Sequence, residues 1–121
     1  MGGRIRSALE RFASPRHRSH VALLFSLGHF ERVMTNEIKK LLDDLAALPI
    51  SEHRQQVDAV IADARDLVKH GEEGVAFESI CQNIYEWDIP LSRANYERLQ
   101  RLGRHYGFES TTWSFLEKVV V

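Results

Sequence analysis

Residues 69–92, KHGEEGVAFESICQNIYEWDIPLS, contain the pattern that decides the fold of this chain. Apolar residues recur at three- and four-residue spacing over residues 73–87, which is the period of one face of an α-helix. Gly71 stands where a preceding helix would end, because glycine readily takes the left-handed conformation found there. Pro90 predicts an extended break after the central helix. The stretch therefore predicts a helix end, an acidic turn, an amphipathic helix and a proline turn into another helix.

The helical period continues on both sides of this stretch. Residues 36–48, 52–70 and 92–106 each carry apolar side chains along one face. Serine, threonine and asparagine favour the first position of a helix, and glycine or proline favours its end. The residues expected to begin or end these helices are Thr35 or Asn36, Pro49, Ser51, Ser92 and Gly107.

Short turns between successive helices predict an all-α fold, a small antiparallel helical bundle with an N-terminal helical extension. Residues 108–121 are ambiguous. Ser110 or Thr111 is suited to cap a short helix there, whereas Val119-Val120-Val121 favours a strand for which the sequence offers no evident partner.

The length and composition limit the classes of protein to be considered. A chain of 121 residues predicts one domain that folds without a disulfide or a metal. Cys81 is the only cysteine, lies in an apolar pattern and is expected to be a buried structural thiol. The longest apolar run is far shorter than the ~20 residues that a membrane span needs, and no secretory cleavage site follows it. These features predict a cytoplasmic protein without membrane association.

Charge divides the chain into two parts. Residues 1–33 hold six Arg, no Lys and two Glu, a net charge of +4, whereas residues 34–121 hold a net charge of −5. We therefore expect a basic N-terminal extension over 1–33 and a helical domain over 34–121. Met34 is also a plausible translation start, so the sequence leaves open whether the extension belongs to the protein. If it does, residues 5–12 and 20–32 predict two short amphipathic helices.

No pattern of catalytic or ligand-binding residues accompanies the helices. The six histidines are scattered, and no zinc-binding or paired Glu-x-x-His motif appears. A nucleophile elbow, a glycine-rich oxyanion turn and a phosphate-binding loop are also missing. We therefore expect a protein that is not an enzyme, with no catalytic residues, no cofactor and no metal.

Acidic and amide side chains gather around the central helix. Three of them are spaced four residues apart on residues 78–86 and therefore share one helix face. The set is interpreted either as a solvated face or as a docking surface for a basic partner, with Tyr85 as an aromatic anchor and Trp87 assigned to the core. The candidate contact residues are Glu72, Glu73, Glu78, Gln82, Glu86 and Asp88.

Residues 69–92 resemble the central motif of small bacterial immunity proteins of the MafI type, which accompany polymorphic or contact-dependent toxins. The resemblance rests on a helix ending in His-Gly-Glu, a Gly-x-Ala helix, a Tyr-Glu end and an Ile-Pro-Leu-Ser turn. It extends from Met34 to about Gly107 and omits residues 1–33. These pieces stand at His70-Gly71-Glu72, Gly74-Val75-Ala76-Phe77-Glu78, Tyr85-Glu86 and Ile89-Pro90-Leu91-Ser92.

The resemblance implies a cytoplasmic immunity protein that binds and neutralises one cognate protein toxin, which in some systems is a nuclease. The acidic charge of residues 34–121 suits a cationic nuclease cleft. Two alternatives stay open: a generic helical interaction or adaptor module, including a homodimer, and a small DNA-binding regulator using the four arginines of residues 92–105. Net acidity disfavours a nucleic-acid partner.

Overall fold

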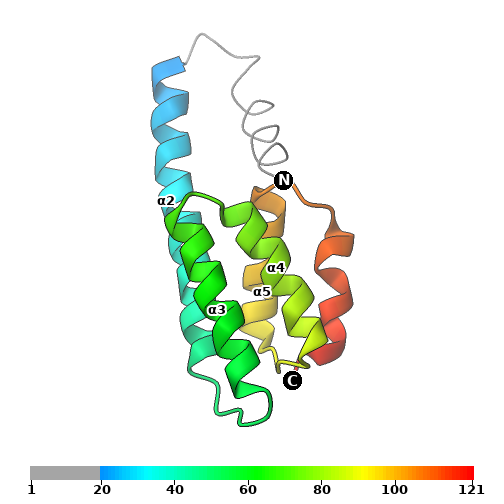
Figure 1. The fold of residues 1–121 in the computed structure, drawn as a ribbon. Helices are drawn as coiled ribbons and strands as arrows, with labels where there is room; N and C mark the ends of the chain where they lie inside the picture. Colours follow the sequence, from blue (N-terminus) through cyan, green and yellow to red (C-terminus); the bar gives the residue numbers. More distant parts are fainter. Residues whose placement is uncertain (1–19) are drawn as a thin grey trace.

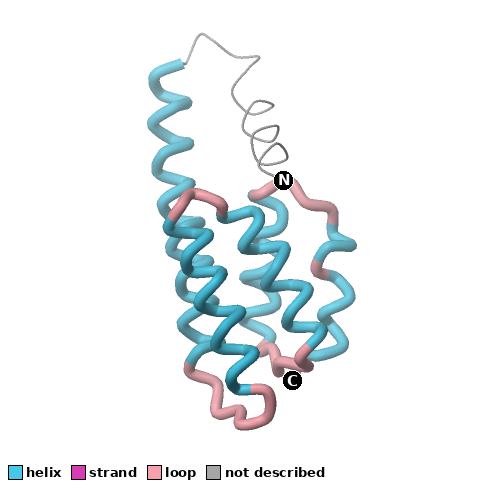
Figure 2. Tube along the Cα trace, in the orientation of Figure 1, coloured by secondary structure: helices cyan, strands magenta, loops and turns pink. Residues whose placement is uncertain are grey.

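The computed structural model describes the backbone of residues 20–121 and the side chains of residues 28–121. Within this range four α-helices run alternately up and down, and two short 3-10 helices follow one another in a single further pass, which confirms the predicted all-α antiparallel bundle (Figure 1). The turns gather at the two ends of the bundle (Figure 2). The elements are α2 (His20–Ala46), α3 (Arg54–Lys69), α4 (Glu73–Glu86), α5 (Arg93–His105), η1 (Ser110–Thr112) and η2 (Ser114–Val119). The short helix expected over residues 5–12 lies outside the described residues.

The apolar stripes read from the sequence form one core. Phe77 of α4 is fully buried, and its ring lies 5.3 Å from that of Phe108 and 6.4 Å from that of Trp113. Aromatic rings at such distances add to the apolar burial that stabilises the core. α4 therefore lies between α3 and the C-terminal segment, as the width of its apolar face predicts. Its buried residues are Gly74, Ala76, Phe77, Ile80, Cys81 and Ile84.

The predicted glycine helix ends are confirmed. Gly71 has a φ of 78°, and the amides of Gly71 and Glu72 bond to the carbonyls of Val68 and Leu67. Gly107 has a φ of 80° and ends α5 with an equivalent pair of bonds, from the amides of Gly107 and Phe108 to the carbonyls of Arg104 and Gly103. This is the arrangement in which a left-handed residue satisfies the last free carbonyls of a helix. Ser92 caps α5 as predicted, since its hydroxyl accepts a hydrogen bond from the Asn95 amide at 3.1 Å.

The expected helix start at residue 35 or 36 is wrong. α2 runs without interruption for 27 residues and joins the two helices that the sequence predicts over 20–32 and 36–48. Thr35 does not cap it; its hydroxyl donates to the carboxylate of Glu73 in α4 at 2.6 Å. No proline interrupts residues 20–46, so nothing forces a break. The helix is also continuous across the expected domain boundary between Val33 and Met34.

The expected cap of the next helix is also wrong. α3 begins at Arg54 instead of residue 52, after His53 in a left-handed conformation with a φ of 58°. Ser51 lies in the preceding turn. The Arg54 guanidinium donates to the carbonyls of Leu48 and Ile50, at 2.7 and 3.4 Å, which holds that turn against the helix. The sequence pattern does not mark this arginine as part of the helix start.

The C-terminal segment packs back along α4. Two 3-10 helices replace the single short helix that the sequence allows, and Leu116 of η2 is fully buried. The β-prone end does find a partner, because Val120 forms an isolated parallel bridge with Leu91. This contact brings the end of the chain to the turn that follows α4.

Candidate functional site

The six residues that the sequence proposes as a contact surface are spread along the whole of α4, and four of them lie at its two ends. Glu72 and Glu73 stand at its N-terminal end, and Glu86 and Asp88 stand at its C-terminal end. At 1.5 Å per residue, the 14 residues of the helix separate these ends by about 20 Å. Only the C-terminal group, together with Gln82, faces solvent beside a groove.

Glu73 is bonded into the bundle. Its carboxylate accepts hydrogen bonds from the hydroxyls of Thr35 in α2 and Tyr106 at the end of α5. Burial, and then the bond to Glu73, raises the pKa of the Tyr106 hydroxyl far above its ordinary value. The carboxylate therefore ties three helices together. Glu72 is half-buried at the same end and does not cap the helix through its side chain.

Glu78 lies between the two ends and is also half-buried. Burial, and then the charge of Glu78, raises the pKa of the Cys81 thiol well above its ordinary value. Cys81 is fully buried, as predicted for a structural thiol. A neutral thiol without access to solvent is a poor nucleophile.

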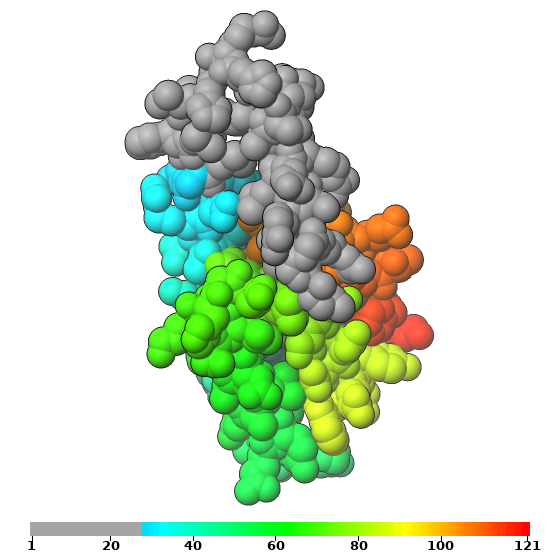
Figure 3. All heavy atoms as spheres, turned by 45° about the horizontal axis from the view of Figure 1, so that its top comes forward, coloured from blue at the N-terminus to red at the C-terminus, as the bar shows by residue number. Residues whose placement is uncertain are grey.

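The surface groove beside the exposed end of α4 lies between this helix and η2. It has a volume of about 680 Å³ and is lined by Gln82, Tyr85, Glu86, Asp88 and Phe115; we call it the aromatic groove. The Tyr85 and Phe115 rings meet edge to face, with centroids 5.3 Å apart and planes at 80°. In the space-filling view, the yellow-green end of α4 adjoins the red C-terminal segment (Figure 3).

A second groove, of about 390 Å³, lies on the other side of Glu86 and Asp88. It separates the turn before α3 from the turn after α4, and Glu52 adds a third carboxylate to its lining. Trp87, assigned to the core from the sequence, is half-buried there, with its ring 5.0 Å from that of His53. Sequence reasoning missed Glu52 and Phe115 as site residues, because each comes from an element far from α4 in the chain.

Glu86 and Asp88 occupy positions that folding alone does not favour. Glu86 is the last residue of α4, where the negative end of the helix dipole repels a carboxylate. Asp88 has a φ of 48° and ends the helix as Gly71 and Gly107 end theirs, with the Ile89 amide bonded to the Ile84 carbonyl. An aspartate thus stands where the other two helix ends have glycine.

No cation compensates these charges within the described side chains. Among residues 28–121, none of the ion pairs includes Glu86 or Asp88. Residues 70–92 contain five carboxylates and neither Lys nor Arg. The exposed end of α4 therefore presents negative charge directly to solvent or to a partner.

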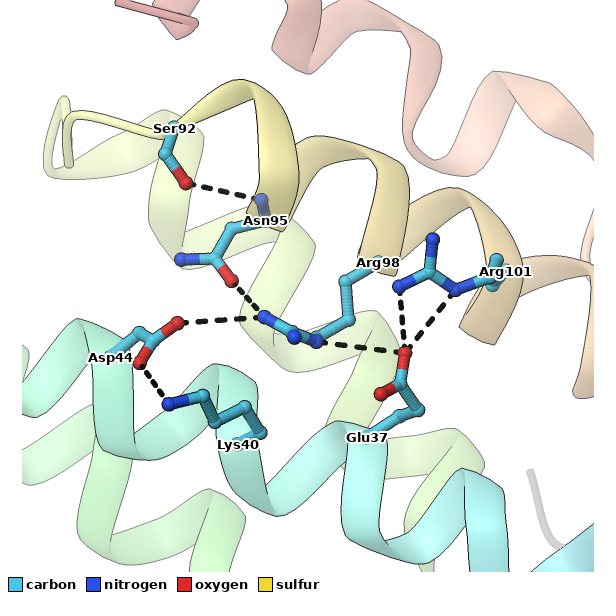
Figure 4. Close-up of polar contacts among 7 residues, drawn as sticks. All are labelled: Glu37, Lys40, Asp44, Ser92, Asn95, Arg98 and Arg101. Atoms are coloured by element: carbon cyan, nitrogen blue, oxygen red, sulfur yellow. Dashed lines mark hydrogen bonds and ion pairs between the residues drawn. The ribbon is translucent and has the colours of Figure 1, made fainter.

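Three of the four arginines of α5, by contrast, hold carboxylates within the bundle, and Figure 4 shows two of them, Arg98 and Arg101. Arg98 donates to Asn95 at 2.6 Å and pairs with Asp44 and Glu37 of α2 at 3.4 and 3.6 Å. Arg101 pairs with Glu37 at 2.7 Å. Arg93 pairs with Glu117 of η2 at 3.1 Å. Arginines that already hold carboxylates are poorly placed to bind phosphates, which weakens the DNA-binding alternative.

Two further properties concern possible ligands and membranes. Within the described part of the chain, no three His, Cys, Asp or Glu side chains are arranged to hold a metal ion. No helix between residues 20 and 121 combines the length and the apolar character that a membrane crossing requires.

Comparison of the chain with protein-family models, with curated proteins and with solved structures finds no match. The resemblance to MafI-type immunity proteins is therefore carried by the quoted motif alone and stays a prediction. The geometry of the site is an independent basis for a functional proposal.

Proposed function

We propose that this protein is an immunity protein, which binds a cognate bacterial toxin and neutralises it by covering a cationic surface of the toxin. Its contact surface is centred on Glu86 and Asp88 and includes Gln82, Tyr85 and Phe115 around the aromatic groove. This surface leaves out Glu72, Glu73 and Glu78 of the six residues that the sequence suggests. The Glu73 carboxylate, for instance, is bonded to Thr35 and Tyr106.

The observation that carries the proposal is the position of two carboxylates at a helix end that disfavours them. Glu86 faces the negative end of the helix dipole, and Asp88 adopts a left-handed conformation that glycine takes more easily. Local arrangements that oppose stability are concentrated at functional sites. A basic partner would compensate both charges and would be drawn to them over a distance.

The first experiment is co-expression of the full chain with the toxic polypeptide encoded immediately beside its gene. Growth and co-purification are scored for the wild type, for the double variant Glu86→Lys with Asp88→Asn, and for Glu97→Lys. Glu97 is the matched control, an exposed carboxylate of α5 outside the ion pairs of residues 28–121.

We expect the wild type and Glu97→Lys to restore growth and to co-purify with the toxin, and the double variant to do neither. Failure of the full chain beside a neighbour shown to be toxic would remove the immunity proposal for that pair. Full protection by the double variant would remove the proposed surface instead.

The homodimeric adaptor is the second candidate, and one feature of α2 favours it. Phe30 and Val33 are 44% and 41% exposed near each other on this helix, beyond the buried Met34. Exposed apolar side chains grouped on a helix are typical of association surfaces. Sedimentation of the purified chain without any partner tests this alternative, which requires a stable dimer.

A further inference from the structure

The aromatic groove combines two kinds of side chain that recognise organic cations together. Tyr85 is 53% exposed, whereas five of the nine aromatic side chains among residues 28–121 are buried in the core. Its ring and the half-buried ring of Phe115 form an edge-to-face corner. The faces of aromatic rings attract cations, and in proteins the cation is more often an arginine than a lysine.

The groove also supplies acceptors beside these rings. Glu86 and Asp88 line it together with the amide of Gln82, and no cation of residues 28–121 pairs with either carboxylate. A guanidinium group can lie flat against a ring and still direct N–H groups at carboxylates in its plane. The aromatic rings and the carboxylates of this groove thus together suit a guanidinium group, which needs a flat surface to stack on and acceptors for its N–H groups.

We propose that the aromatic groove binds an arginine side chain of the partner, against Tyr85 and between the carboxylates of Glu86 and Asp88. The inference rests on the proposed function, since it names the group by which a basic toxin is held. The groove is open to solvent, so the arginine it binds can belong to a longer segment of the partner. Lysine fits less well, because its ammonium is compact and strongly hydrated and cannot stack.

The test uses the full chain and two synthetic peptides of identical length, acetyl-Gly-Ser-Arg-Gly-Arg-Ser-Gly-amide and its lysine equivalent. Binding is followed by nuclear magnetic resonance of the isotope-labelled protein at fixed ionic strength. The protein variants are Tyr85→Leu, Glu86→Gln with Asp88→Asn, and the control Glu97→Gln. Circular dichroism confirms that each variant is folded.

We expect the arginine peptide to shift the amide signals of residues 82–88 and Phe115 and to bind about two- to fivefold more tightly than the lysine peptide. Tyr85→Leu should abolish this preference while both peptides still bind. The double variant should weaken both peptides, and Glu97→Gln should change neither.

Equal affinity for the two peptides, or signal changes confined to other surfaces, would overturn the inference. A preference for arginine that survives Tyr85→Leu would overturn it as well. The growth assay separates this failure from failure of the proposed function. If protection depends on Glu86 and Asp88 but the peptides bind equally, the proposed function holds and the arginine inference fails. If the arginine peptide binds selectively but the chain gives no protection, the arginine inference holds for the groove and the proposed function fails.

Discussion

Replacing Gly103 with alanine tests the packing of the C-terminal segment against the bundle. Gly103 lies in α5, and an added Cβ would be 2.3 Å from the Cε3 and Cζ3 atoms of Trp113 and 3.0 Å from Cζ of Phe77. Carbon atoms pack best at about 3.5–4.0 Å, so the indole ring would have to move by more than 1 Å. Trp113 is 3% exposed and Phe77 is fully buried, which leaves little space for that movement.

The size of the effect follows from two opposing contributions. An extra methyl group in a packed core costs about 1–3 kcal/mol, and the rigid neighbours of Gly103 favour the upper part of that range. Alanine in place of glycine inside a helix returns about 1 kcal/mol. We therefore expect Gly103→Ala to lower the free energy of unfolding by about 1–2 kcal/mol.

Gly28 provides the matched control in α2. Among the described side chains, a Cβ there would have only the Nη1 atom of Arg32 within 4 Å, at 4.0 Å. Gly28→Ala should therefore raise the free energy of unfolding by up to about 1 kcal/mol. Urea unfolding of both variants measures the difference, which we expect to be about 1–3 kcal/mol. Equal stabilisation by the two alanines would refute the close packing of Trp113 on Gly103.

Three further predictions concern the polar contacts of the bundle. Arg98→Met should lower the free energy of unfolding by about 1–3 kcal/mol, because the Arg98 side chain is only 16% exposed between α5 and α2. Arg93→Met breaks an exposed ion pair and should lower the free energy of unfolding by less than about 1 kcal/mol. Urea titration measures both variants. Tyr106→Phe should cost about 1.5–3 kcal/mol at neutral pH through loss of the bond to Glu73. The pKa of Tyr106 is raised in the folded state, so the wild type loses stability above pH ~10, where the unfolded tyrosine ionises. Unfolding measured across that range should show the difference between Tyr106→Phe and the wild type shrinking. Asp88→Gly should raise the free energy of unfolding by about 1 kcal/mol and weaken binding of the proposed basic partner. A variant without any gain in thermal or urea stability would contradict the strain assigned to Asp88.

Local chemistry explains which parts of the fold the sequence predicts. Gly71, Gly107 and Ser92 act as expected, because a left-handed helix end and a serine cap depend only on residues a few positions away. The apolar stripe of α4 also packs as its period predicts.

The errors arise at two helix starts, where the observed structure includes side-chain contacts that lie outside the local capping pattern. Thr35 has the chemistry of a cap, yet its hydroxyl bonds to Glu73, which is 38 residues away. Ser51 is likewise a suitable cap, but Arg54 bonds to the carbonyls of the preceding turn and α3 begins later. Residue type alone cannot distinguish a cap from a helix-interior residue with a tertiary partner.

The candidate site shows the same division. Gln82 and Glu86 share a helix face by their spacing, and Asp88 follows directly in the chain, so the sequence groups them correctly beside one groove. Phe115 completes that groove only because η2 folds back along α4. Glu72 and Glu73 are separated from these residues by the length of the helix. Grouping the carboxylates by their closeness in the sequence overlooks this distance.

The two ends of α4 provide an internal comparison that bears on function. Glu73 stands at the N-terminal end, where the helix dipole favours a carboxylate, and two hydroxyls bond to it. Glu86 and Asp88 stand at the C-terminal end, where the same dipole opposes them and no cation of residues 28–121 pairs with them. Folding therefore accounts for the first carboxylate and not for the other two. Because no cation of residues 28–121 balances these two charges, we expect their removal to stabilise the protein alone and to weaken its complex with the proposed basic partner.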